Sequence, residues 1–117
     1  MATDFRGGRA FPRRGRNEYV GYLWLLRVFD KARAFRNGTI DDYVYPCPID
    51  RAIFERWGIT SQAFDEALAT CGTDDEILRW LTERVGDERR EVANRYLLEE
   101  RMSNLQQQDA EEGVAAV

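Results

Sequence analysis

The stretch "GYLWLLRVFDKARAF", residues 21–35, decides how this chain of 117 residues folds. Its apolar side chains are spaced for a helix and occur on nearly every side of it, which is typical of a helix buried in a core. Yet Arg27, Asp30 and Lys31 stand within five residues of each other. We call these three residues the charged stripe. The question is what balances these three charges on a buried helix.

The flanking residues set the limits of the predicted helix. Asn17 is a plausible N-cap, and "NG" at residues 37–38 closes the pattern, so a helix over residues 17–36 is expected. At 100° per residue, one face holds Val20, Leu23, Trp24, Arg27, Asp30, Lys31 and Ala34. Positive charge exceeds negative charge on this helix, so an anion from outside it is needed. Asp50 or Asp42 could supply it, as could a bound ligand.

Four more helices are predicted from caps and breakers. Pro48 suits a first helical position, and Gly58 ends the apolar pattern that follows it. Thr60 or Ser61 caps the next helix, which runs to Cys71. "TDDE" at residues 73–76 is a capping box that opens a fourth helix, and an amphipathic fifth helix spans about residues 87–102.

These elements predict an all-α fold: one compact domain of about five helices with the hydrophobic first helix in the centre. Residues 1–16 are expected to form an extended Arg-rich arm, residues 17–102 the helical domain, and residues 103–117 a polar, acidic tail that frays. The longest apolar run is far shorter than the roughly 20 residues that cross a membrane. With no secretory signal, the expected location is the cytoplasm.

Residue types narrow the chemistry. The chain has no histidine, which removes the usual proton shuttle and most zinc or iron sites, so we expect no metal and no cofactor. Cys47 and Cys71 form no C-x-x-C pair and are expected to be free thiols. An enzyme is therefore disfavoured. Lys31 is the only lysine beside 16 arginines. It is either an ordinary salt-bridged lysine or one that contacts a ligand.

A candidate ligand site surrounds the charged stripe. The Pro-stiffened link "YVYPCPID" at residues 43–50 has to pack near the first helix. In one interpretation its tyrosines belong to the core and Asp50 pairs with Arg51 or Arg27. In the other, Arg27 and Lys31 hold an anionic group in an aromatic pocket. The candidate ligand-binding residues are Trp24, Arg27, Asp30, Lys31, Tyr43, Tyr45, Cys47 and Asp50.

The arm is a second candidate surface, because it carries a net charge of +4 while the remaining residues carry −8. Its candidate partner-binding residues are Arg6, Arg9, Arg13, Arg14 and Arg16. Arginines interleaved with glycine and aromatic residues suit nucleic acid, but one arm neutralises few phosphates and the acidic body repels them. The arm could equally lie on an acidic partner or on the protein's own surface.

The leading hypothesis is a binding or adaptor module that docks on a protein partner or on a second copy of itself. The alternatives are a protein or small enzyme that binds a small anion through Lys31 and Arg27 near Tyr43 and Tyr45, and nucleic-acid binding through the arm. No catalytic motif supports an enzyme, and the sequence does not identify a ligand or partner.

Four stretches carry a resemblance: "GYLWLLRVFDKAR" at 21–33, "YVYPCPID" at 43–50, "FERWGI" at 54–59 and "DDEILRWL" at 74–81. They resemble an uncharacterised bacterial family of small proteins, one of the families of domains of unknown function. The resemblance covers residues 17–85 and leaves out the arm and the segment beyond Gly86. It implies a shared site or a shared core constraint around the charged stripe, and no activity.

Overall fold

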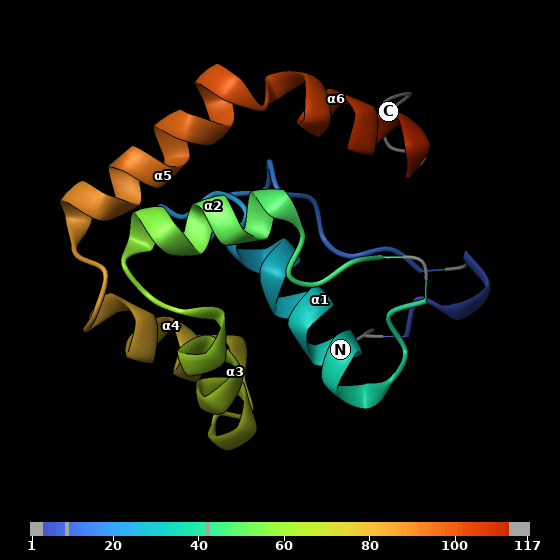
Figure 1. Ribbon diagram of the computed structural model, residues 1–117, viewed down its shortest axis with the longest axis horizontal. Coiled ribbons are helices and arrows are strands. Elements are labelled where there is room, and N and C mark those ends of the chain that lie inside the picture. Colours follow the sequence, from blue (N-terminus) through green and yellow to red (C-terminus); the bar gives the residue numbers. More distant parts are fainter. Residues whose placement is uncertain (1–3, 9, 42, 113–117) are drawn as a thin grey trace.

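The computed structural model describes residues 4–8, 10–41 and 43–112, which form one all-α domain (Figure 1). This confirms the predicted fold class, with one helix more than the expected five. The helices are α1 (Leu25–Asn37), α2 (Pro48–Trp57), α3 (Ser61–Thr70), α4 (Asp74–Thr82), α5 (Asp87–Glu100) and α6 (Met102–Glu111), after a short 3₁₀ turn at Arg6–Gly8.

Helix α1 lies near the middle of the molecule, with the other helices above it and on one side, and with the N-terminal segment and the link to α2 on the other (Figure 1). Its side chains Leu25, Val28 and Phe29 are completely buried. Phe29 stacks on Phe64 of α3 with ring centroids 6.0 Å apart, and Phe64 contacts Phe54 of α2 at 5.2 Å. Aromatic packing therefore fixes α2 and α3 against the central helix. Helices α5 and α6 form an arc along one side.

The ends of α2, α3 and α4 follow the predicted signals. Pro48 opens α2, and Gly58 ends it with a φ of 77°, a conformation that favours glycine. The Thr60 side chain accepts a hydrogen bond from the Ala63 amide at 3.0 Å. The Thr73 side chain likewise accepts a hydrogen bond from the Glu76 amide at 3.2 Å. These three helix starts are confirmed because each depends on neighbouring residues alone.

The predicted start of the first helix is wrong. Helix α1 begins at Leu25, and the residues before it form a tight turn in which the Tyr19 and Tyr22 backbones exchange hydrogen bonds of 2.9 and 3.0 Å. Val20, Gly21 and Trp24 have left-handed backbone conformations, with φ of 48°, 82° and 72°. Val20 is consequently 66% exposed and does not lie on the helix face that the helical pattern predicted for it.

Distant residues hold this turn. The Asn94 side chain of α5 donates to the Gly21 carbonyl oxygen at 2.8 Å and accepts from the Leu23 amide at 3.0 Å. The Trp24 amide donates to the Gly15 carbonyl oxygen at 2.7 Å. Such contacts offset the cost of left-handed φ angles at residues other than glycine. No local pattern encodes them, because Asn94 stands more than 70 residues from the turn.

The segments at both ends of the described chain are folded onto the domain. In the arm, Phe5 is only 1% exposed and its amide donates to the Thr39 carbonyl oxygen at 2.8 Å. The expectation of a fraying tail is wrong for residues 103–112, since α6 forms there and its Leu105 is 1% exposed. Among the described residues, no helix has the length and apolar character needed to cross a membrane.

Candidate functional site

Each member of the charged stripe has an oppositely charged partner within the chain, and each partner comes from a different segment. Lys31 pairs with Asp50 of α2, Asp30 with Arg13 of the arm, and Arg27 with Glu112 just after α6. Helix α1 is therefore the hub of these three ion pairs, and its Arg33 adds a fourth with Asp74 of α4. The expectation that Asp50 supplies an anion for the stripe is confirmed, but the predicted pairing with Arg51 or Arg27 is wrong, because Asp50 pairs with Lys31 and Arg27 with Glu112. Asp42 lies outside the described residues.

The Lys31–Asp50 pair is the most deeply buried of the three. The Lys31 Nζ lies 2.8 Å from Asp50 Oδ2, and the aspartate is 0% exposed. The carboxylate also accepts from the Trp24 Nε1 at 2.7 Å and from the Cys47 amide at 3.0 Å. In return, the Cys47 sulfur accepts from the Asp50 amide at 3.4 Å. Asp50 thus caps α2, neutralises Lys31 and positions Trp24 at the start of α1.

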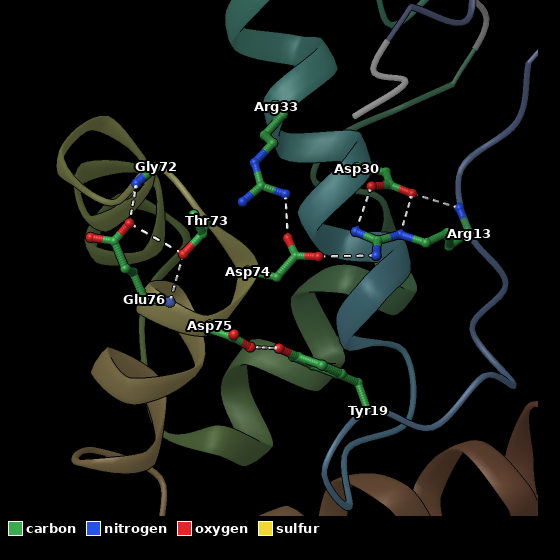
Figure 2. Close-up of polar contacts among 9 residues, drawn as sticks. All are labelled: Arg13, Tyr19, Asp30, Arg33, Gly72, Thr73, Asp74, Asp75 and Glu76. Carbon is green, nitrogen blue, oxygen red and sulfur yellow. Dashed lines mark hydrogen bonds and ion pairs between the residues drawn. The ribbon is translucent and has the colours of Figure 1, made fainter.

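Asp30 belongs to a second network, which Figure 2 shows. Arg13 donates from its backbone amide and Nε to Asp30 Oδ2 at 2.8 and 3.0 Å, and from Nη2 to Oδ1 at 2.9 Å. Its Nη1 reaches Asp74 of α4 at 3.0 Å, and Arg33 donates to the same carboxylate at 2.6 Å. Nearby, the Tyr19 hydroxyl donates to Asp75. The arm is therefore clamped between α1 and α4.

This network lowers the pKa of the Asp74 carboxyl. Burial alone raises the pKa of Asp74, but the hydrogen bonds from Arg33 and Arg13 outweigh it and hold the pKa below its ordinary value. Asp74 is thus ionised at neutral pH and bridges two guanidinium groups.

Arg27 differs from the other two members because its pair borders a cleft. Its Nη1 and Nη2 lie 3.1 and 2.9 Å from the two carboxylate oxygens of Glu112, a bidentate arrangement. The Tyr43 hydroxyl donates to the same carboxylate at 3.1 Å. The Arg27 guanidinium also lies 5.7 and 5.6 Å from the ring centroids of Trp24 and Tyr43. Burial, followed by the charge of Glu112, raises the pKa of Tyr43 to about 12.

The cleft beside this pair has a volume of about 440 Å³. One wall is made by Phe11, Arg27 and Tyr43. The opposite wall comes from Asn104, Gln107, Gln108, Glu111 and Glu112 on and after α6. We call Arg27 and Tyr43, with the carboxylate position between them, the Arg27–Tyr43 site.

Tyr45 does not join the charged stripe. Its hydroxyl donates to Asp65 of α3 at 2.7 Å, and burial followed by that hydrogen bond raises the pKa of Tyr45. Cys47 and Cys71 are unpaired thiols, and Cys47 serves as the N-cap of α2. The candidate ligand residues therefore separate into a buried group around Asp50, a clamp around Asp30, the Arg27–Tyr43 site, and Tyr45 on its own.

Three candidate residues of the arm, Arg13, Arg14 and Arg16, contact the helical domain. Arg14 and Arg16 lie 3.7 and 3.5 Å from the Asp109 carboxylate of α6, and Arg6 pairs with Asp4 at 2.7 Å. Arg9 lies outside the described residues.

Sequence reasoning missed Glu112 as the partner of Arg27 and Asp74 as the partner of Arg13 and Arg33. It allowed the arm to lie on the protein's own surface but did not predict that Arg13 pairs with Asp30. The arm's positive charge against an acidic body was the one available signal, and it identified no pair.

The fold and these pairs define a small all-helical domain with a charged central helix and a carboxylate held beside a cleft. The chain belongs to the family of the domain of unknown function DUF5069, whose model matches residues 9–116. This match includes the arm from Arg9 onward as well as α5 and α6, which the resemblance noted from the sequence left out. No protein with a curated description matches the chain.

Proposed function

We propose that this protein is a binding module that takes up a carboxylate of an acidic partner segment at the Arg27–Tyr43 site. One observation carries the proposal: the site already holds a carboxylate, that of Glu112, by two hydrogen bonds from Arg27 and one from Tyr43. Charge-assisted, bidentate hydrogen bonds between arginine and a carboxylate are stronger than hydrogen bonds between neutral groups. They also select for a planar anion, because the guanidinium fork matches the two carboxylate oxygens.

The charges around the site favour a carboxylate over a phosphate. Among the described residues that line the cleft, Arg27 is the only cation, while Glu111 and Glu112 add negative charge. A dianion would meet one arginine and two glutamates, so like-charge repulsion disfavours it. A single carboxylate replacing that of Glu112 leaves the charge balance unchanged.

The form of the present occupant favours a polypeptide ligand. Glu112 reaches the site from a helical segment, so a glutamate on another chain can be presented in the same way. Phe11, 41% exposed, and the carboxamides of Gln107 and Gln108 line the cleft beside it. They offer apolar contact and hydrogen bonds to a peptide backbone.

The test is a titration of the full-length, ¹⁵N-labelled protein with glutamate capped by acetyl and amide groups, followed by NMR. We expect saturable shifts of the Arg27 side-chain and Tyr43 amide signals. Capped glutamine is the matched control, since it differs only in lacking the charge. Tyr43→Phe should weaken binding several-fold, and Arg27→Lys should weaken it more because the fork is lost. Equal responses to both ligands, or none to either, would refute the proposal.

A small carboxylate compound is the second candidate, and the cleft of about 440 Å³ favours it because that volume accommodates a small molecule. Arm-mediated nucleic-acid binding and a cytoplasmic location stay predictions from the sequence. Arg13, Arg14 and Arg16 already contact carboxylates of the domain, which lowers the charge that the arm can offer to phosphates.

A further inference from the structure

We infer that α6 is a built-in occupant of the Arg27–Tyr43 site, and that the partner is an acidic amphipathic helix that repeats the anchoring pattern of α6 and replaces it. This inference depends on the proposed function. It adds the chemistry of the partner and a means of regulation, because Glu112 occupies the site and every ligand has to compete with it.

The anchors of α6 lie on one helical face. Leu105, Asp109 and Glu112 are spaced i, i+4 and i+7, the spacing with which amphipathic helices bind in grooves. Leu105 is 1% exposed in the core. The Asp109 carboxylate faces Arg14 and Arg16 of the arm, at 3.7 and 3.5 Å. Glu112 fills the Arg27–Tyr43 site.

The remaining attachment of α6 is weak. A break in the helical backbone at Arg101, with φ of −126°, separates α6 from α5, and no side chain caps the start of α6. Leu105 is the only residue within α6 that is fully buried. Met102 at the start of α6 is only partly buried against the core, and the cleft is lined by residues of α6 on one hand and by Phe11, Arg27 and Tyr43 on the other. A segment with few buried apolar contacts opens at a lower free energy than the core.

The closed arrangement also leaves buried polar atoms unsatisfied. Among the described residues, Arg27 Nε and Gln108 Oε1 are buried and have no hydrogen-bond partner. Each such atom has lost its water without a replacement, which disfavours the closed state. Leu105, Asp109 and Glu112 therefore stabilise the position of α6, while the unsatisfied polar atoms destabilise it. This balance is expected for an occupant that another helix can replace.

Removing α6 would uncover the surface that identifies the partner. Arg14, Arg16 and Arg27 would lose their present partners, Asp109 and Glu112, next to the apolar surface that Leu105 covers. A helix with leucine, aspartate and glutamate in the order L-x-x-x-D-x-x-E would satisfy all three arginines and cover the apolar surface. A basic or purely apolar helix would not.

The experiment uses a fluorescent, amidated peptide of residues 101–112, which contains this pattern, and full-length protein. Glu112→Ala should bind the peptide roughly tenfold more tightly than the wild type, because weakening the internal occupant raises the fraction of open sites. Glu112→Gln provides the same comparison with less disturbance around Arg27. Glu55→Ala is the matched control, since it removes an exposed glutamate of α2 that does not line the cleft, and it should bind like the wild type. A peptide carrying the Glu112→Gln change should bind more weakly.

Hydrogen exchange provides the second measurement. Bound peptide should accelerate exchange of the amides of residues 102–112 in the protein and leave those of α1 unchanged. Equal peptide affinity for wild type, Glu112→Ala and Glu112→Gln, or unchanged exchange in α6 at saturation, would overturn the inference. If capped glutamate still binds at Arg27 in that case, the proposed function stands alone. If neither ligand binds any variant, both proposals fail.

Discussion

Asp50 illustrates how a buried charge is stabilised residue by residue. It is fully buried, yet its carboxylate accepts from Lys31, Trp24 and the Cys47 amide. Removing one partner of such a pair leaves an uncompensated charge without water and lowers the stability. The complete pair, in contrast, gives about the same stability as apolar residues packed in its place. The sequence indicated that the stripe needed an anion and named Asp50. It could not indicate Glu112, because the Arg27–Glu112 pair spans 85 residues.

The first prediction concerns Lys31. Replacing Lys31 with Met should lower the free energy of unfolding by about 3 kcal/mol, because Asp50 is then buried without its counter-charge. Arg79→Met, at an exposed position of α4, is the matched control and should change stability by less than about 0.5 kcal/mol. Urea denaturation followed by tryptophan fluorescence measures both. Equal effects would mean that the Lys31–Asp50 pair contributes nothing to folding.

At the scale of the elements, α2, α3 and α4 could be predicted because their caps act on residues three positions away. The start of α1 could not, since the left-handed φ of Val20 and Trp24 is imposed by contacts from Gly15, Asn94 and Asp50. Helix α6 was missed for a related reason. Its sequence is rich in glutamine and has one buried leucine, so the apolar pattern was too sparse to indicate a packed helix.

The second prediction tests how the arm approaches the start of α1. A Cβ atom at Gly15 would lie 2.1 Å from the Trp24 ring, so Gly15→Ala has to push Trp24 away from Asp50. We expect a loss of about 2 kcal/mol in stability. The control is Gly72→Ala, whose Cβ would have its nearest neighbour at 3.7 Å. Thermal unfolding by circular dichroism compares the two, and a control as destabilised as Gly15→Ala would rule out the steric explanation.

The third prediction concerns the clamp at Asp74, whose pKa is lowered in the folded state. An acid with a lowered folded pKa stabilises the protein above its unfolded pKa, about 3.9 for aspartate. That contribution disappears as the pH falls through the folded pKa. The difference in unfolding free energy between the wild type and Asp74→Asn should therefore be largest near neutral pH and shrink below about pH 4. Urea denaturation across this pH range measures it.

The matched control for this pH series is Asp41→Asn, which changes an exposed aspartate. It should lower stability by less than about 0.5 kcal/mol and show little pH dependence. A difference for Asp74→Asn that stays constant from neutral pH to pH 2 would contradict the assignment of Asp74 as the ionised bridge between Arg13 and Arg33.

At the scale of the whole molecule, the ion pairs of α1 connect the arm, α2 and the segment after α6 to one helix. Lys31 is 4% exposed and lies beneath these segments, so we expect that opening the arm or α6 alone does not expose it. As the only lysine of the chain, it reports on unfolding of the entire domain.

The fourth prediction follows from this burial. An amine-reactive reagent should modify Lys31 at the rate of global unfolding, so modification is slow in buffer and accelerates with denaturant in parallel with loss of helical signal. Digestion and mass spectrometry quantify the modified Lys31 peptide. Glu112→Gln should leave the rate nearly unchanged if α6 opens alone. Rapid modification of the native wild type would contradict a buried Lys31–Asp50 pair.

The separations of the three ion pairs along the chain have a consequence for protein synthesis. The partner of Asp30 is synthesised 17 residues before it, and the partner of Lys31 is synthesised 19 residues after it. Glu112, the partner of Arg27, is synthesised 85 residues after Arg27. On the ribosome, the first two pairs can therefore form while translation continues. Arg27 lacks this partner until α6 and Glu112 have left the exit tunnel, so a nascent chain presents the carboxylate-binding arginine to the cell before α6 can cover it.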